Sequence, residues 1–434
     1  MTKQFSVPRG TNDILPENIF AWRSLEDSVR KLVHLYGYQE IRTPIFEETE
    51  LFARSMGQTS DVVQKQMLQL AAQPKPEETG VVLSGLALRP EATAAVVRAY
   101  IENSLDKKEP LSKLFYIGPM FRGERPQKGR LRQFHQVGVE ALGPGSASPY
   151  LDAEVIALAV HLLEALGVEG FQLKINNLGS LDDKKNLSKW LREKLGGRLS
   201  DLCSDCQDRF ERNVFRILDC KNPTCREVIA KTNLNYQECF SKESVEYFSK
   251  TKEALSALGI SYQESMQLVR GLDYYTNTVF EITAPSLGSQ DALGAGGRYN
   301  HLVEELGGAK VDAIGFALGI ERILLALGET KKVLAQPMDA FLVVLAPTLL
   351  SKAFQLVNEL RQSGVSVDMS YHPGSLKSQM RMANKQGARF VILLGEDEDR
   401  KGVVAVKNME TGEQKEVNIK NNLEELIALL NGEK

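Results

Sequence analysis

The chain has 434 residues, of which 43% are hydrophobic and 25% are charged. These are ordinary values for folded globular proteins and exclude disordered, collagen-like and low-complexity classes. The length favours two or three domains, each with its own core. Lys and Arg total 53 against 56 Asp and Glu, so the net charge gives no sign of a nucleic-acid binder, although such a count cannot detect a local basic patch.

The chain lacks both targeting and membrane signals. No run approaches the roughly 20 consecutive apolar residues of a membrane span, and the N-terminus lacks the apolar stretch of a signal peptide. Five cysteines, an odd number, lie between Cys203 and Cys239 and fit a reducing compartment better than a disulfide framework. We therefore expect a cytoplasmic protein that does not contact membranes.

The N-terminal part of the chain alternates helical and strand patterns. Residues 19–36 carry apolar side chains at helical spacing, Gly37 ends that pattern, and a strand is predicted at 39–42. Further strands are predicted at 113–117, 133–137 and 278–282. Because turns and other elements separate them, these strands indicate a largely antiparallel sheet and an α+β fold class rather than a doubly wound one.

Two changes of pattern divide the chain. Residues 181–258 read as amphipathic helices rich in Lys, Glu and Asp, which predicts a helical domain inserted into a first domain of residues 1–327. Residues 328–337 resemble a linker, and an apolar strand at 339–345 opens a second, α/β domain over 338–434. The strand at 390–394 has no polar position, so we expect it at the centre of its sheet.

Two segments place charged side chains next to buried elements. In Leu88-Arg-Pro-Glu-Ala-Thr-Ala94, Pro90 stops a strand and Glu91 opens a helix, where a carboxylate can bind a ligand or simply cap the helix. The segment from Phe121 to Arg130 alternates basic and flexible residues. Arginine binds phosphate oxygens bidentately, although a solvated basic turn would show the same pattern.

A third group of segments predicts a pocket. Residues 268–276 hold an arginine beside Gly271 and the paired Tyr274 and Tyr275, and residues 294–300 form a glycine-rich loop that would let a ligand approach the backbone. Residues 315–322 end in Arg322. The glycine spacing does not match a dinucleotide fingerprint, and no βαβ unit surrounds it.

Together these segments resemble the class II aminoacyl-tRNA synthetases, and specifically the histidyl-tRNA synthetase family, over essentially the whole chain. Residues 37–44 are similar to the dimer-forming first class motif, 121–136 to the second and 315–322 to the third. Residues 270–275 and 295–299 resemble the two signatures of the histidine-specific family.

The resemblance implies a class II catalytic domain with an antiparallel sheet and a helical insertion, followed by a C-terminal α/β anticodon-binding domain. It also implies ATP-dependent ligation of L-histidine to its cognate tRNA(His) through histidyl-adenylate, by a homodimer. Mg²⁺ would accompany ATP and neutralise its phosphates.

Residue roles follow from the same resemblance. The expected catalytic residues are Arg122, Arg270 and Arg322, with Arg270 standing where other class II enzymes use an additional metal ion. Phe121 or Phe134 would lie near the adenine, and Gln127 and Lys128 would contact the tRNA acceptor end. The residues implied in ATP binding are Arg122, Glu124, Arg130, Phe134 and Arg322. Those implied in histidine binding are Glu91, Thr93, Arg122, Gln136, Glu140, Arg270, Tyr274, Tyr275 and Tyr299.

The chain departs from the family pattern at two places. Ala92 stands where glycine is usual, and the hairpin at 68–76 lacks the common aromatic and acidic residues. An alternative function is that of a non-catalytic, synthetase-like regulatory subunit of histidine biosynthesis. Such a protein should lack parts of the signatures and the anticodon domain, which this chain retains.

The cysteines leave two interpretations open. Cys203-x-x-Cys206 followed by Cys220 and Cys225 has a spacing acceptable for a four-thiolate structural zinc site. The second pair is separated by four residues that include Pro223, which favours free thiols buried among the helices. Neither outcome changes the expected enzyme.

Overall fold

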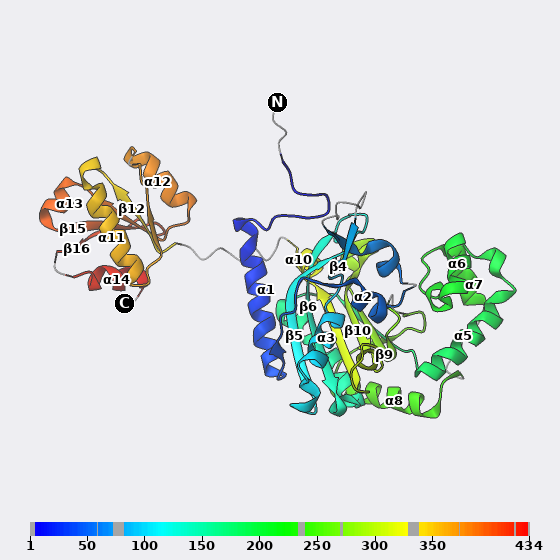
Figure 1. Ribbon diagram of the computed structural model, residues 1–434. Coiled ribbons are helices and arrows are strands. Elements are labelled where there is room, and N and C mark those ends of the chain that lie inside the picture. The colour runs from blue at the N-terminus through cyan, green and yellow to red at the C-terminus, as the bar shows by residue number, and fades with distance from the viewer. Residues whose placement is uncertain are drawn as a thin grey trace. The chain divides into compact units, whose positions relative to one another are not determined.

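The computed structural model describes residues 5–58, 60–72, 82–232, 239–269, 272–328, 338–372, 374–420 and 422–432. It divides into two compact units, residues 1–332 and 333–434 (Figure 1). Of the linker expected at 328–337, residues 329–337 lie outside the described residues. None of the helices within the described ranges is long and apolar enough to cross a membrane.

An eight-stranded sheet forms the centre of the first unit. All neighbouring strands are antiparallel except two parallel pairs at the two edges, which confirms the predicted α+β class. In spatial order the strands are β1 (Gln39–Glu40), β5 (Ser112–Phe121), β6 (Gln133–Gly143), β11 (Asp312–Gly319), β10 (Ala292–Arg298), β9 (Thr276–Thr283), β7 (Gln172–Asn177) and β8 (Gln263–Glu264).

Several strands differ in length from the sequence prediction. β5 and β6 extend well past 113–117 and 133–137, because their pairing continues through Gly118 and Gly138, which interrupt the apolar pattern. The strand predicted at 39–42 is reduced to β1. The glycine-rich segment expected to be a loop is part of β10, and its glycines let β10 lie close to β11, since a Cβ at Gly296 would overlap the Gly315 carbonyl oxygen.

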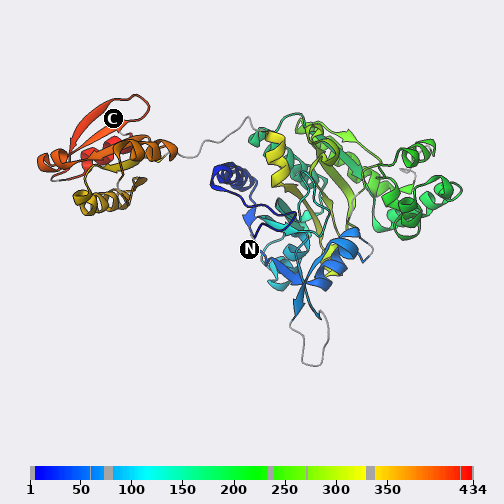
Figure 2. The same cartoon turned by 90° about the horizontal axis from the view of Figure 1, so that it is seen from above.

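One face of this sheet is covered by α1 (Pro16–Leu35) and α4 (Pro149–Leu166). α1 is seen side-on in Figure 1 and end-on in Figure 2. It begins at Pro16, three residues before the predicted start, because proline suits the first turn of a helix. Its buried Val29 and Val33 belong to the same apolar core as Val137 and Val139 of β6, so the alternate residues of β6 are left for the other face of the sheet.

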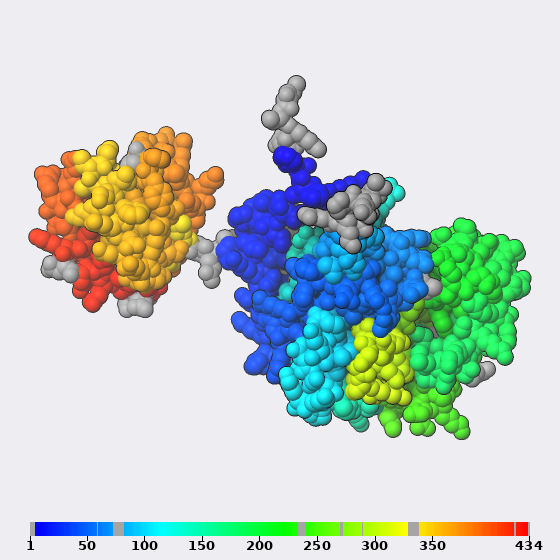
Figure 3. Space-filling view, viewed as in Figure 1, coloured from blue at the N-terminus to red at the C-terminus, as the bar shows by residue number. Residues whose placement is uncertain are grey.

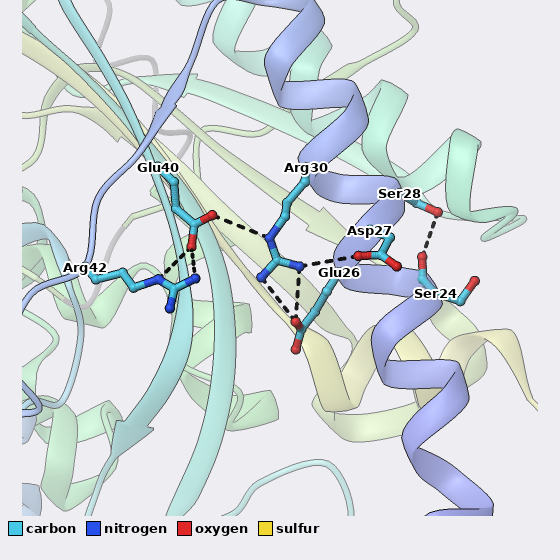
Figure 4. Close-up of polar contacts among 7 residues, drawn as sticks. All are labelled: Ser24, Glu26, Asp27, Ser28, Arg30, Glu40 and Arg42. Atoms are coloured by element: carbon cyan, nitrogen blue, oxygen red, sulfur yellow. Dashed lines mark hydrogen bonds and ion pairs between the residues drawn. The ribbon is translucent and has the colours of Figure 1, made fainter. Parts of the chain in front are cut away.

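Polar contacts join α1 to the strand that follows it. Arg30 of α1 lies 3.4 Å from the Glu40 carboxylate and 3.3 Å from that of Glu26, and Arg42 lies 2.7 Å from Glu40 (Figure 4). Asp27 adds a further contact to Arg30 at 3.6 Å (Figure 4). These ion pairs hold the 37–44 segment against the helix, although exposed pairs of this kind contribute little stability individually.

Smaller elements complete the first unit. A three-stranded sheet has the order β2 (Phe46–Glu48), β4 (Val82–Leu88) and β3 (Leu68–Ala72); of the hairpin noted at 68–76, residues 73–76 lie outside the described residues. The remaining helices are α2 (Thr49–Met56), α3 (Thr93–Glu102), α8 (Lys242–Ala257), α9 (Leu302–Glu305) and α10 (Ile320–Leu327).

The predicted insertion, residues 181–258, contains α5 (Leu181–Gly196), α6 (Ser204–Arg212), α7 (Pro223–Lys231) and α8, with a 3-10 turn η5 (Val214–Ile217) between α6 and α7. Phe248 and Leu255 of α8 belong to the apolar core of the large sheet. In the space-filling view the insertion forms the green mass beside the blue segments of the first unit (Figure 3). It contacts the rest of the first unit through Lys184, which donates to the carbonyls of Asp273 and Tyr275, at 3.1 and 3.0 Å. The insertion therefore supports the backbone that carries the paired tyrosines.

The second unit contains a mixed five-stranded sheet of order β13 (Val367–Met369), β12 (Ala340–Val344), β14 (Phe390–Leu394), β15 (Val403–Asn408) and β16 (Gln414–Asn418). β14 is its central strand, as its uninterrupted apolar sequence predicted. The helices are α11 (Leu350–Gln362), α12 (Leu376–Lys385), α13 (Glu396–Lys401) and α14 (Glu424–Asn431).

Candidate active site

A cavity of about 480 Å³ lies on the sheet face opposite α1 and α4. β6 contributes Phe134, Gln136 and Glu140, which point to one face because side chains alternate along a strand. The cavity brings together most of the predicted site residues, from segments that are far apart in the sequence. The predicted residues that line it are Glu91, Thr93, Arg122, Glu124, Arg130, Phe134, Gln136, Glu140, Tyr274, Tyr275, Tyr299 and Arg322.

Two glycines make room for functional side chains on the floor of the cavity. Gly315 of β11 pairs with Glu140 of β6, and a Cβ at Gly315 would overlap the Glu140 carboxylate. Gly138 pairs with Tyr116 of β5, and a Cβ there would overlap the Tyr116 hydroxyl. The missing side chains let the carboxylate and the phenol lie flat across the neighbouring strand.

Glu140 is the central group at one end of the cavity. Its side chain is almost fully buried and accepts hydrogen bonds from the Thr93 hydroxyl at 2.7 Å and the Tyr299 hydroxyl at 2.5 Å. Burial raises the pKa of Glu140 to about 8, although both hydrogen bonds oppose the rise. The carboxyl group is therefore largely neutral at pH 7 in the free protein, and it can give up its proton to a basic ligand.

Three tyrosines surround this carboxyl group. The rings of Tyr274 and Tyr275 lie 4.6 Å apart, and those of Tyr274 and Tyr299 lie 5.7 Å apart. Burial raises the pKa of Tyr274 and of Tyr299 well above the usual value. Their hydroxyls keep their protons near neutral pH, so each can donate a hydrogen bond as well as accept one.

Glu91 caps a helix, and its position is also compatible with ligand binding, the other role that the sequence left open. Its carboxylate accepts from the backbone N–H groups of Thr93 and Ala94, at 2.6 and 3.0 Å, and so caps α3. The same buried carboxylate lines the cavity. The helix begins at Thr93 rather than at Glu91, and Ala92 has φ of −108°, which any residue adopts, so the backbone tolerates alanine in place of glycine.

Gln136 lies in the same part of the cavity. Its side-chain Oε1 is buried and has no hydrogen-bond partner among the residues that the structure describes. A buried acceptor without a partner is costly. A ligand ammonium group would supply the missing donor while lying next to the Glu91 carboxylate.

The cavity also holds three arginines, of which Arg122 interacts electrostatically with Glu91. Arg322 of α10 donates to the carbonyls of Gly129 and Ala292, at 2.8 and 2.7 Å. Arg122 donates to the Pro90 carbonyl at 3.0 Å, and its guanidinium lies 5.2 Å from the centre of the Phe134 ring. Backbone carbonyls thus fix both guanidinium groups before any ligand binds.

These arginines repel one another. Burial lowers the pKa of Arg322, and the positive charges of Arg122 and Arg130 lower it further. Arg130 forms an ion pair with the buried Glu124 carboxylate, which offsets part of this charge. Such a group of fixed cations is suited to a multiply charged anion such as a polyphosphate.

The turn between β5 and β6 extends out of this arginine group. Gln127 and Arg130 exchange backbone hydrogen bonds of 3.0 and 2.9 Å, and Gly129 between them has φ of +73°. Gln127 and Lys128 are exposed at the tip and do not line the cavity. They are placed to meet a large ligand that approaches from solvent.

Some predicted residues lie elsewhere, and some lining residues were not predicted. Arg270 lies outside the described residues, and Phe121 is not among the lining residues, whereas Phe134 is. Tyr116 and Glu281 line the cavity but were not singled out. Tyr116 occupies the same face of the sheet as Glu140, and only the strand pairing, which brings Gly138 opposite it, could have revealed this.

The arginine of the 295–299 signature supports the site instead of lining it. Arg298 is fully buried, its Nε lies 2.7 Å from the Asp152 carboxylate, and it donates to the Ser148 carbonyl at 3.3 Å. This ion pair ties β10 to the start of α4. It therefore fixes the backbone of the neighbouring Tyr299.

Comparisons with known proteins agree with this geometry. The family model for histidyl-tRNA synthetase matches residues 10–323, and that for the anticodon binding domain matches 339–429. The chain is 45% identical to the histidine–tRNA ligase of Desulforamulus reducens, over 95% of this chain and 96% of that protein. It is 46% identical to that of Moorella thermoacetica, over 95% of each. The crystal structure of apo S. aureus histidyl-tRNA synthetase superposes with a TM-score of 0.77 at 36% identity, covering 99% of both chains. The chain therefore belongs to the histidyl-tRNA synthetase family.

Proposed function

We propose that this chain ligates L-histidine to its cognate tRNA in two steps within the cavity. The histidine carboxylate attacks the α-phosphorus of ATP, the bond to pyrophosphate breaks, and histidyl-adenylate forms. A terminal ribose hydroxyl of the tRNA then attacks the histidyl carbonyl carbon, loses its proton, and displaces AMP. The observation that carries the proposal is one cavity that is lined both by buried carboxyl groups and by three arginines.

The carboxyl end suits histidine. The α-ammonium group would lie between Glu91 and the unpaired Oε1 of Gln136, with the Thr93 hydroxyl nearby. One imidazole nitrogen would donate to Glu140, and a tyrosine hydroxyl of Tyr274, Tyr275 or Tyr299 would complement the other, since a hydroxyl can act in either role. This arrangement satisfies every polar group of the amino acid except its carboxylate, which is left facing the arginines.

The arginine end suits ATP. Arg122 would bind the α-phosphate, Arg322 the γ-phosphate, with Arg130 at the tail and Phe134 against the adenine. The carboxylates of Glu124 and Glu281 line the same cavity and offer the oxygen ligands that Mg²⁺ prefers. When bound with ATP, Mg²⁺ would neutralise phosphate charge that the arginines leave exposed. Fixed cations stabilise the charge that develops on the α-phosphate without having to reorganise.

The tRNA would contact two separate parts of the chain. Gln127 and Lys128 would meet the acceptor end as it enters the cavity, and residues 338–434 would bind the anticodon. We assign residues 1–327 to the catalytic domain, 181–258 to its insertion and 328–337 to the linker. Single-stranded ends and loops present exposed base edges, which makes two distant contacts reasonable for a tRNA.

We further propose a homodimer formed through the 37–44 segment. Arg89 holds this segment from inside by donating to the carbonyls of Thr43 and Pro44, at 3.0 and 3.3 Å. Ile45 and Phe46, directly after it, are about half exposed, as expected for apolar residues that a partner covers. An obligate interface of this kind should bury well over ~2,000 Å². A stable monomer in sedimentation at micromolar concentration would contradict this proposal.

The test of the function is histidine-dependent exchange of pyrophosphate with ATP, followed by aminoacylation of total tRNA with each amino acid separately. We expect exchange and charging with histidine alone. A non-catalytic regulatory subunit would give neither signal, and charging with a different amino acid would refute the assigned specificity.

A further inference from the structure

The insertion brings four cysteines together from three separate segments. Cys203 precedes α6, Cys206 lies in the first turn of α6, Cys220 follows η5, and Cys225 lies in the first turn of α7. All four Sγ atoms lie within 4.8 Å of one another. We propose that they bind one structural zinc ion as four thiolates, an inference that does not depend on the proposed function.

The distances match a tetrahedral metal site rather than disulfides. The Sγ atoms of Cys203 and Cys220 are 3.9 Å apart, and all four cysteines have free thiols. A disulfide needs about 2.05 Å between its sulfurs. Zinc with bonds of about 2.3 Å to four sulfurs places neighbouring sulfurs about 3.8 Å apart. Four thiolates fill all positions of the ion, so the site would be structural rather than catalytic.

The surroundings suit a site with a net negative charge. The backbone N–H of Cys203 donates to the Sγ of Cys225 at 3.2 Å, and such bonds orient and stabilise thiolate ligands. Arg209 interacts electrostatically with Cys206 and Cys220. Arg226 donates to the Cys220 carbonyl at 3.3 Å. Two guanidinium groups therefore lie beside a centre that would carry two negative charges when zinc is bound.

A metal ion would also explain how this part of the insertion stays folded. α6 and α7 have nine residues each, and helices of this length are marginal without support. Small modules with little core commonly use a metal as a staple. Here the ion would join the starts of both helices to the segment at Cys220.

The same ion would hold part of the active-site wall. Asp219, the residue before Cys220, lines the cavity that holds the arginines. Asn213, at the end of α6, donates to the Asp273 carboxylate at 2.9 Å, next to the paired tyrosines. Loss of zinc should therefore disturb the cavity as well as the insertion.

The first experiment measures metal in the full-length protein, purified without chelators, by elemental analysis. We expect one zinc per chain and a colourless protein. In native protein a thiol reagent should modify at most Cys239, whereas after denaturation with a chelator it should modify all five cysteines. Less than about a tenth of an equivalent of zinc, with the four clustered thiols reactive, would overturn the proposal, and bound iron would overturn the identity of the metal.

Variants and metal replacement make the test specific. Cys206→Ser should lose most of the zinc, and Cys239→Ser, which changes a cysteine outside the cluster, should retain one equivalent. Should Cys206→Ser not fold, cobalt added to metal-depleted wild-type protein decides the question. Tetrahedral thiolate coordination gives intense visible bands and sulfur-to-cobalt charge transfer in the near ultraviolet. Weak octahedral bands would refute a four-cysteine site.

Discussion

Replacing Glu140 with glutamine tests how the cavity recognises imidazole. Glutamine keeps the shape but cannot become negative. Thr93 and Tyr299 bond different oxygens of Glu140, so the amide oxygen can accept from one of these hydroxyls while the amide NH2 group donates to the other. A hydrogen bond to a charged group contributes about 1.5–3 kcal/mol and a neutral one about 0.5–1.5 kcal/mol. The difference of about 1–2 kcal/mol predicts a histidine KM raised about 5- to 30-fold. Glu140→Ala, which leaves the ring N–H unpaired, should cost at least as much.

The pH dependence gives a sharper signature. Free histidine has an imidazole pKa of about 6.5, and the pKa of Glu140 is about 8. Between these two pKa values, free Glu140 is protonated and free imidazole is neutral, so together they hold one titrating proton. A carboxylate–imidazolium pair in the complex also holds one, so binding neither releases nor takes up a proton. Below this window binding must release a proton, and above it binding must take one up. The histidine KM should therefore rise about tenfold per pH unit on either side. In Glu140→Gln the alkaline rise should be less steep, because only the α-ammonium group of histidine, with a pKa of about 8, still titrates there.

The assay is pyrophosphate exchange at varied histidine, from about pH 5.5 to about pH 9. The ATP KM should change little, because the hydrogen bonds of Glu140 go to Thr93 and Tyr299 and not to the arginines. Glu154→Gln is the matched control, since that carboxylate pairs with Lys113 at 2.6 Å and does not line the cavity. An unchanged histidine KM in Glu140→Gln, or an alkaline rise as steep as in the unmodified protein, would refute the assigned role.

Three further predictions concern charge. Arg270→His should slow adenylate formation, measured by pyrophosphate exchange, by about 10²–10³-fold. Transfer from preformed histidyl-adenylate, measured by single-turnover charging, should slow far less. Equal losses in both steps would assign Arg270 another role. Arg298→Met should lower the free energy of unfolding by about 3–5 kcal/mol, because it leaves Asp152 buried without its partner; in urea unfolding, the double variant with Asp152→Asn should recover part of this loss. The pKa of Glu140 is higher in the folded protein than in the unfolded chain, so this group contributes fully to stability below its unfolded pKa. As pH rises from there towards about 8, the free energy of unfolding should decline by up to about 1.4 kcal/mol per pH unit. Unfolding of Glu140→Gln should lack this decline.

The sequence predicted the elements better than their ends. Strand patterns placed β5, β6 and β9 correctly, but pairing with neighbouring strands decided how far each extends. The glycines at 294–297 were interpreted as a loop because single-sequence patterns favour turns for glycine. In the structure they belong to β10, where a neighbouring strand leaves no room for a side chain.

Site residues differ in how far the sequence could reveal them. The arginines and Glu140 could be assigned from the resemblance, because they lie in recognisable motifs. Tyr116 could not, since its place in the cavity follows from its pairing with Gly138. For the cysteines, the interval containing Pro223 argued against a shared site. The structure supports the other interpretation, because Pro223 begins α7 and so directs Cys225 back towards Cys203.

The cavity contains two groups of side chains with opposite charge preferences, the buried carboxyl groups and the arginines. Without ligand, each group is electrostatically unfavourable. Burial raises the pKa of Glu140, and burial together with repulsion from Arg122 and Arg130 lowers the pKa of Arg322. Neither feature stabilises the fold, so their presence points to ligands that relieve them. Histidine brings a cationic end to the carboxyl groups, and ATP brings polyphosphate to the arginines. With the ligands placed as proposed, the amino-acid carboxylate would face the α-phosphate. Under this proposal ligand binding would itself align the two reacting groups, and we expect positioning and fixed charge to supply the catalysis without a covalent enzyme intermediate.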